Sequence, residues 1–159
     1  MLTPFRHLVV LMLENRSFDH MLGFLKSDDY AIEGLNGDET NDPVNDNELP
    51  VRVSRDAHSA HDLNPDPGHD FIDVNVQIFG NKDGTPNGAL MRGFVRDYAL
   101  VSNHAEQGAN IMKCFSVNTL PVLSTLAREF AVCDHWYSSV RGPRFPTACS
   151  PTRPVPRVR

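Results

Sequence analysis

The stretch TLPVLSTLAREFAVCDHWY, residues 119–137, decides the fold class of this 159-residue chain. Its first half predicts a helix over residues 119–129, because Thr119 can cap it, Pro121 suits a first turn, and apolar side chains recur at three- and four-residue spacing. The apolar positions are Val122, Leu123, Leu126, Ala127 and Phe130. Its second half, residues 130–137, predicts a strand that ends at a Ser-Ser and Gly-Pro turn.

A second strand is predicted near the start of the chain. HLVVLML, residues 7–13, is a continuous apolar run that is typical of a central parallel strand buried on both faces. Helical spacing follows over residues 17–25 and again over residues 89–99. Residues 71–79 fit a strand or a helix, and their Asp-rich start favours a helix. Residues 27–68 are rich in Asp, Asn, Pro and Gly and predict a long loop region. This order of strands and helices indicates an α/β fold.

The charge of the chain is divided unevenly along its length. The net charge is −5, but residues 1–80 hold 15 acidic and 5 basic side chains, whereas residues 81–159 hold 5 acidic and 10 basic ones. The last 19 residues contain five Arg, five Pro and no acid, so residues 147–159 predict a disordered Pro/Arg-rich tail. The mild overall acidity argues against a nucleic-acid partner.

The sequence also bears on the compartment. The three cysteines, Cys114, Cys133 and Cys149, are odd in number and widely spaced, so neither a disulfide framework nor a CxxC zinc site is predicted. No apolar run reaches the roughly 18–20 residues of a transmembrane segment. The chain begins without the basic and long apolar regions of a signal peptide. We therefore expect a cytoplasmic protein as written, and a secreted one if the true N-terminus is missing.

Two polar pairs, Glu14-Asn15 and Asp134-His135, lie at or near the carboxyl ends of the predicted strands, where α/β sheets collect their chemistry. The carboxylate and amide oxygens of Glu14-Asn15 are hard ligands, suited to Mg²⁺, Ca²⁺ or Mn²⁺. The alternative is structural: Ser17 or Asp19 caps the following helix, and Glu14 is a solvated strand end.

A histidine-rich loop, HSAHDLNPDPGHD, occupies residues 58–70. The spacing of His58, His61 and His69 matches no established zinc motif, so a solvated loop stays open as an interpretation. The Asp66-Pro67-Gly68-His69 segment predicts a turn, and such a turn can hold one imidazole rigidly toward a site.

Several longer motifs carry a resemblance to a known family. In chain order they are VVLMLENRSFDHMLGFL, HDLNPDPGHDF, QIFG, GFVRDY and MKCFSVNTLPVLSTLAREFAVCDHWYSSVRGP. Together they resemble the N-terminal portion of the bacterial phosphoesterase family, which includes phosphatidylcholine-type and plant non-specific phospholipases C and a related acid phosphatase. The resemblance covers residues 5–146, so we expect residues 1–146 to be the N-terminal part of a phosphoesterase domain. It implies an alkaline-phosphatase-like α/β sandwich with a mostly parallel sheet, present here as an incomplete, N-terminal fragment.

The resemblance also implies roles for individual residues. Glu14 and Asn15 match the family's metal-binding pair, which implies a divalent metal ion of unknown identity. His69 matches a histidine near the phosphate, where it could donate a hydrogen bond to a phosphoryl or leaving-group oxygen. The family's nucleophile is the Thr or Ser of a motif resembling Gly-Pro-Thr-x-Pro-Asn-Arg. This chain has Arg144 at that position, and arginine cannot form the phosphoenzyme.

The resemblance implies metal-assisted, phospholipase C-like hydrolysis of a phospholipid or other phosphoester. We expect the chain as written to be truncated and inactive, since the match stops abruptly at the nucleophile motif and residues 147–159 resemble out-of-frame sequence. Two alternatives stay open. One is an acid phosphatase acting on soluble phosphomonoesters, and the other is a non-catalytic remnant that binds metal or phosphate.

Overall fold

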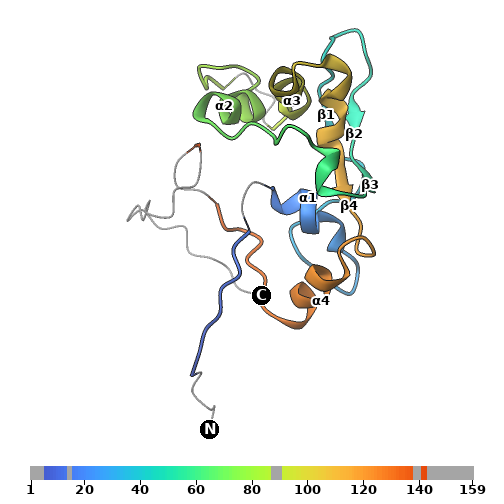
Figure 1. The fold of residues 1–159 in the computed structure, drawn as a ribbon, viewed down its shortest axis with the longest axis vertical. Helices are drawn as coiled ribbons and strands as arrows, with labels where there is room; N and C mark the ends of the chain where they lie inside the picture. The colour runs from blue at the N-terminus through green and yellow to red at the C-terminus, as the bar shows by residue number, and fades with distance from the viewer. Residues whose placement is uncertain (1–5, 14–15, 87–90, 138–140, 143–159) are drawn as a thin grey trace.

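The computed structural model describes residues 6–13, 16–86, 91–137 and 141–142 (Figure 1). Helical elements account for most of its regular structure. Their order with the short strands is α1 (Phe18–Leu22), η1 (Gly23–Leu25), β1 (Thr40–Asn41), β2 (Val51–Arg52), β3 (Ser54–Ala57), η2 (Ala60–Asp62), α2 (Phe71–Phe79), α3 (Phe94–Ser102), η3 (Ala105–Met112), β4 (Lys113–Phe115) and α4 (Pro121–Glu129). In the described part of the chain, no helix is long and apolar enough to cross a membrane.

The first two helices confirm the sequence prediction because local capping fixes them. The Ser17 hydroxyl accepts the N–H of His20 at 3.1 Å and starts α1, which continues as η1 over the predicted range. Asp70 and Asp73 form a capping box at the start of α2, and Gly80 ends this helix with a φ of 73°. A few neighbouring residues therefore set the start of α1 and both ends of α2.

Helix α3 begins later than the predicted 89–99 range. Residues 87–90 lie outside the described part, and the helix starts only after Gly93. The N–H of Gly93 donates to the carbonyl of Gln77 at 3.0 Å, and a Cβ at position 93 would lie 1.8 Å from the Val76 oxygen. These contacts with the end of α2 fix the backbone of Gly93, and α3 therefore begins at Phe94.

Helix α4 confirms the predicted helix, but its apolar face is packed differently. Its cap is Leu120, while the Thr119 hydroxyl turns back to the Ser116 carbonyl at 2.8 Å. Ala127 is buried, whereas Val122 is 74% exposed and Phe130 is 71% exposed. Only part of the predicted face therefore packs against the rest of the described chain.

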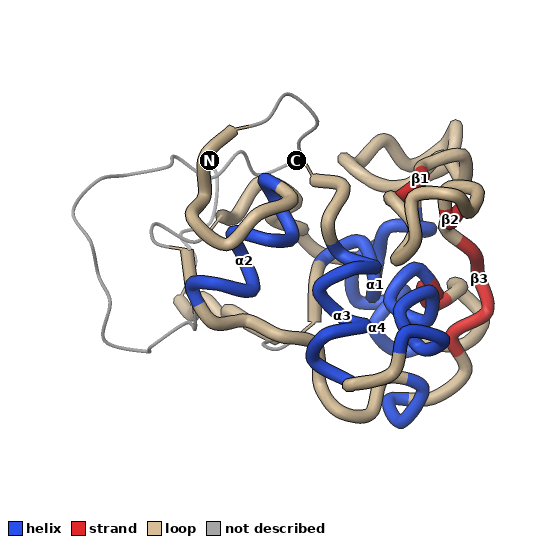
Figure 2. Tube along the Cα trace, turned by 90° about the horizontal axis from the view of Figure 1, so that it is seen from above, coloured by secondary structure: helices blue, strands red, loops and turns tan. Residues whose placement is uncertain are grey.

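The strands form two small sheets. β1 pairs with β2 in antiparallel fashion, and β3 pairs with β4 in parallel. Figure 2 shows these strands along one side of the helices. The described chain is therefore α/β with one parallel pair, and this pair joins residues more than 50 positions apart, Ser54 and Lys113.

Both strands expected from the sequence are wrong. Residues 8–13 are not in a strand, and their side chains are 46–89% exposed; in Figure 1 this segment runs away from the packed elements. A central strand is buried only when strands pair with both of its edges, and the strands described here pair with each other. Residues 130–137 are also not a strand, because this segment is held by side-chain contacts such as the Asp134 carboxylate on the Glu33 N–H at 2.9 Å.

The long loop region over residues 27–68 is more structured than predicted. It contains β1, β2, β3 and η2, and it contributes buried side chains to the core. One core cluster joins Phe24, Val53 and Cys114, and another joins Leu25, Ile32 and Ala127. The prediction missed this because the region is mostly polar, and only a few of its apolar side chains, such as Ile32 and Val53, are buried in the core. Cys114 and Cys133 are free thiols.

Candidate functional site

The predicted His69 turn lies directly before α2. Its imidazole is exposed, and Nδ1 lies 3.2 Å from the carbonyl oxygen of Pro67 two residues earlier. A Cβ at Gly68 would come within 2.6 Å of the Asp73 carboxylate, so this position requires glycine. The structure does not confirm the predicted turn: residues 66–69 form neither a hydrogen-bonded turn nor a bend, although the ring lies at the surface.

A partly buried polar network between α2 and α3 holds the chain just before His69. The Gln77 side chain donates from Nε2 to the Gly68 carbonyl at 2.7 Å and to the Asp97 carboxylate at 2.7 Å. Asp97 is 3% exposed. Burial raises the pKa of Asp97 to about 6; the hydrogen bond from Gln77 lowers it, and the nearby Asp73 charge raises it.

An ion pair connects the DPGH segment, residues 66–69, to the N-terminal motif. Arg16 Nη1 lies 2.9 Å from Asp66 Oδ1, and the Arg16 side chain is only 16% exposed. The buried Tyr98 donates from its hydroxyl to the Pro65 carbonyl at 3.0 Å, one residue before Asp66. Glu14 and Asn15, the predicted metal pair, lie outside the described residues. Their sequence neighbour Arg16 is paired with Asp66, which precedes His69 by three residues.

The segment before the nucleophile position also reaches α2. Arg141 donates from Nη1 to Asn75 Oδ1 at 2.6 Å, and its guanidinium lies 5.0 Å from the centre of the Phe71 ring. A Cβ built on Gly142 would lie 3.8 Å from the Phe71 nitrogen at the first turn of α2. Arg144 itself falls outside the described residues.

Two segments that are distant in the sequence therefore each lie against residues 66–75. Arg16 contacts Asp66 before α2, and residues 141–142 approach Phe71 and Asn75 on α2. An exposed imidazole beside the N-terminal turn of a helix can bind an anion, since both can offer N–H donors.

The other polar candidates have structural roles. Asp134 Oδ1 lies 3.0 Å from His135 Nδ1, and Asp134 Oδ2 accepts the Glu33 N–H. Burial would raise the pKa of Asp134, but the hydrogen bonds from Glu33 and His135 outweigh it and hold this pKa below its usual value. This pair joins residue 33 to the segment after α4.

The histidine-rich loop does not gather its imidazoles into a metal centre. The Asp62 carboxylate accepts the backbone N–H groups of His58 and Ser59, which caps η2. Across the described ranges, no group of three or more His, Cys, Asp or Glu side chains could hold a metal ion. The solvated-loop interpretation therefore fits His58 and His61.

Some residues of this region were missed by sequence reasoning. Gln77 and Asp97 lie in the QIFG and GFVRDY motifs, but nothing local indicates that they meet. His20 is buried, packs edge-on against Phe115 with 5.1 Å between ring centres, and has no hydrogen-bond partner on Nδ1. Burial lowers the pKa of His20, and the Arg16 charge lowers it further. It belongs to the packing beneath the N-terminal motif.

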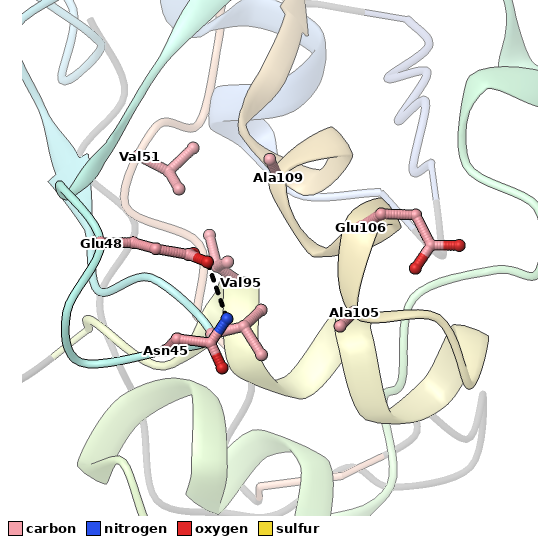
Figure 3. A pocket seen from close by; sticks show the side chains of 8 residues that line it. Asn45, Glu48, Val51, Val95, Ala105, Glu106 and Ala109 are labelled. Atoms are coloured by element: carbon pink, nitrogen blue, oxygen red, sulfur yellow. Dashed lines mark hydrogen bonds between the residues drawn. The ribbon is translucent and has the colours of Figure 1, made fainter.

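A cleft of about 350 Å³ lies elsewhere, between the segment around β1 and β2 and the helices α3 and η3 (Figure 3). Its floor is apolar, and at its rim Asn45 Nδ2 donates to Glu48 Oε1 at 2.7 Å. None of the described residues predicted for the site lines this cleft.

Comparison with known proteins matches the family expected from the motifs. The model of the Phosphoesterase family matches residues 5–149. Non-specific phospholipase C1 of Arabidopsis thaliana is 41% identical over 155 residues, which cover 94% of this chain and 26% of that protein. Non-specific phospholipase C6 of the same plant is 39% identical over 146 residues, covering 91% and 26%, respectively. The chain thus spans about a quarter of the length of these relatives, and it belongs to the Phosphoesterase family.

Proposed function

We propose that this chain contributes to a phosphoester-hydrolysing site of the phospholipase C type, located around the first turn of α2. The Arg16–Asp66 ion pair carries this proposal, because it ties the ENRSFDH motif to the DPGH segment across 50 residues. The contact of Gly142 with Phe71 supports it, since it brings the nucleophile motif to the same place. The relatives are non-specific phospholipases C, which favours a phospholipid substrate.

Glu14 and Asn15 are the proposed ligands of a divalent metal ion. Such an ion would polarise the phosphoryl group and neutralise its developing charge. His69 would hydrogen-bond a phosphoryl or leaving-group oxygen from its exposed ring. These roles match the residue types, and the described geometry supports only the nearness of Arg16 and the DPGH segment.

A second candidate function is non-catalytic binding of a phosphate group. Arg144 favours it, because arginine cannot accept a phosphoryl group in a covalent step but its planar guanidinium binds phosphate well. In this version the chain binds metal and phosphate and releases no product. An acid phosphatase acting on soluble monoesters is a third outcome that the substrate panel below distinguishes.

The test is equilibrium binding of Mn²⁺ and of phosphorylcholine to the 159-residue chain. Glu14→Ala should abolish Mn²⁺ binding, and His69→Ala should weaken phosphorylcholine binding while leaving Mn²⁺ binding intact. The matched controls are Glu48→Ala and His104→Ala, an exposed carboxylate and an exposed imidazole outside this region. Mn²⁺ binding that survives Glu14→Ala, or equal losses in the controls, would contradict the assignment. A panel of phosphatidylcholine vesicles, phosphorylcholine and p-nitrophenyl phosphate separates lipid, headgroup and general phosphomonoester recognition.

A further inference from the structure

The side-chain amide of Gln77 joins three elements at one nitrogen. Nε2 donates to the Gly68 carbonyl in the DPGH segment and to Asp97 Oδ2 on α3, each at 2.7 Å, while Gln77 itself belongs to α2. A carboxamide has two N–H donors, so both are used. The opposite orientation would place the Gln77 carbonyl oxygen against two acceptor oxygens. The amide is therefore fixed in one orientation.

Asp97 holds this amide in place from the protein interior. Its side chain is buried, and its first-turn position on α3 is fixed by the packing of α3 against α2. The neighbouring Tyr98 is also buried and donates to the Pro65 carbonyl, just before residues 66–70. Helix α3 thus holds the chain before His69 at two points, at Pro65 through Tyr98 and at Gly68 through Gln77.

His69 lies between two anchored residues. Gly68 is held by Gln77 on one side, and on the other side the Asp70 N–H donates to Asp73 Oδ2 at 2.9 Å. With the backbone fixed on both sides, the ring lies with Nδ1 3.2 Å from the Pro67 carbonyl oxygen. A carbonyl can only accept, so the neutral ring carries its proton on Nδ1 and leaves the Nε2 lone pair unprotonated.

We propose that Gln77 and Asp97 are positioning residues that fix the backbone around His69, so that Nε2 is the ring atom presented to a phosphoryl group. Nε2 accepts a hydrogen bond when the ring is neutral and donates one when the ring is protonated. This inference deepens the proposed function and rests on it for the identity of the ligand. The arrangement of this backbone itself does not depend on any ligand.

The experiment measures the His69 tautomer by ¹⁵N NMR of histidine-labelled protein at pH 8, above the ordinary pKa of a free imidazole. In the wild-type chain, the Nδ1 signal should be that of a protonated nitrogen and the Nε2 signal that of an unprotonated one. A free neutral imidazole carries its proton mainly on Nε2, so the expected pattern is the reverse of the unconstrained one. Sedimented protein gives the same reading as dissolved protein, so self-association does not block the measurement.

Four variants separate positioning from general loss of structure. Gln77→Met removes both donors and Asp97→Leu removes the acceptor, so each should move His69 toward the unconstrained tautomer. Asp97→Asn keeps an oxygen that can accept from Gln77 and should restore the wild-type pattern. Asn81→Ala is the matched control, because Asn81 is a similar amide clamp after α2 that bonds Phe79 and Thr85 instead of the DPGH segment.

The signals of His20 and His135 show whether the fold is retained. If Gln77→Met also shifts the His20 and His135 signals, the fold has changed, and Gln77→Asn replaces it as the test variant. Gln77→Asn keeps the amide but shortens the side chain by one methylene. A protonated Nε2 in the wild-type chain, or an unchanged His69 in the Gln77 variant that folds, would overturn the inference. Titration with phosphorylcholine is a separate reading, made at a pH low enough that the ¹⁵N signals show both ring nitrogens protonated, since only a protonated Nε2 can donate to a phosphoryl oxygen. A His69 that ignores the ligand under these conditions refutes the proposed function and leaves the positioning role standing.

Discussion

Replacing Asp97 by Asn should change how the stability of the chain depends on pH. Asp97 is 3% exposed, and burial raises its pKa from 3.8 to about 6. A rise of about two units at about 1.4 kcal/mol per unit corresponds to about 3 kcal/mol. The folded state holds this proton more tightly than the unfolded state. Its stabilising contribution is therefore fully present below pH 3.8 and is lost as the pH rises through about 6.

The Asn variant has no such proton to lose. Its free energy of unfolding, compared with that of the wild type, should therefore improve by about 2.5 kcal/mol between pH 4 and pH 8, because the unfolded carboxyl group is already partly ionised at pH 4. Any cost of fitting the Asn amide is the same at both pH values and cancels from this difference. The assay is urea unfolding followed by far-UV circular dichroism at each pH.

Asp83→Asn is the control with the opposite sign. Asp83 accepts the Thr85 N–H at 2.9 Å, and this hydrogen bond holds its pKa below 3.8. Its contribution is present above its ordinary pKa and is lost as the pH falls through the folded value, so removing it should hurt most at neutral pH. Parallel profiles for wild type and Asp97→Asn, or a change of the same sign as in Asp83→Asn, would refute the reasoning about the buried carboxyl group.

Three further outcomes are expected from the same chain. Purified protein should hydrolyse p-nitrophenyl phosphate no faster than its Glu14→Ala variant, because Arg144 stands where the family resemblance places the nucleophile, and loss of a nucleophile removes several orders of magnitude in rate; metal-dependent turnover above that control would contradict this. Gly93→Ala should lower the free energy of unfolding by about 3 kcal/mol or more in urea titrations, since the new Cβ would lie 1.8 Å from the Val76 oxygen, and a wild-type midpoint would show that the contact yields. Val9→Lys with Leu11→Lys should reduce concentration-dependent light scattering, because these side chains are 89% and 62% exposed; unchanged scattering would mean that another surface associates.

The helices were predictable because their signals are local. Ser17 caps α1 by accepting the N–H of His20 three residues later, and the Asp70–Asp73 box and Gly80 bound α2 within ten residues. The strands were not predictable, because burial of residues 8–13 depends on pairing partners that the apolar run cannot specify by itself. Parallel pairing of β3 with β4 likewise joins segments with no shared pattern.

For the candidate site as well, local features were predictable from the sequence and long-range contacts were not. The DPGH letters predicted a turn that presents His69; the structure places the ring at the surface, but residues 66–69 do not form a turn. The Arg16–Asp66 and Gln77–Asp97 contacts span 50 and 20 residues, and each pairs common surface residue types that carry no signal of their partner. A sequence can indicate which residues carry chemistry, but these long-range contacts decide which of them lie together.

The proposal that the Glu14-Asn15 pair lies near His69 can be tested with Mn²⁺, whose unpaired electrons broaden NMR signals close to it. Added to ¹⁵N-labelled chain, Mn²⁺ should broaden the signals of His69 and of the Phe71 amide, and Glu14→Ala should abolish this broadening while Glu48→Ala leaves it intact. If Mn²⁺ binds in a Glu14-dependent manner and His69 and Phe71 stay sharp, the motifs do not form one site, and the account is wrong.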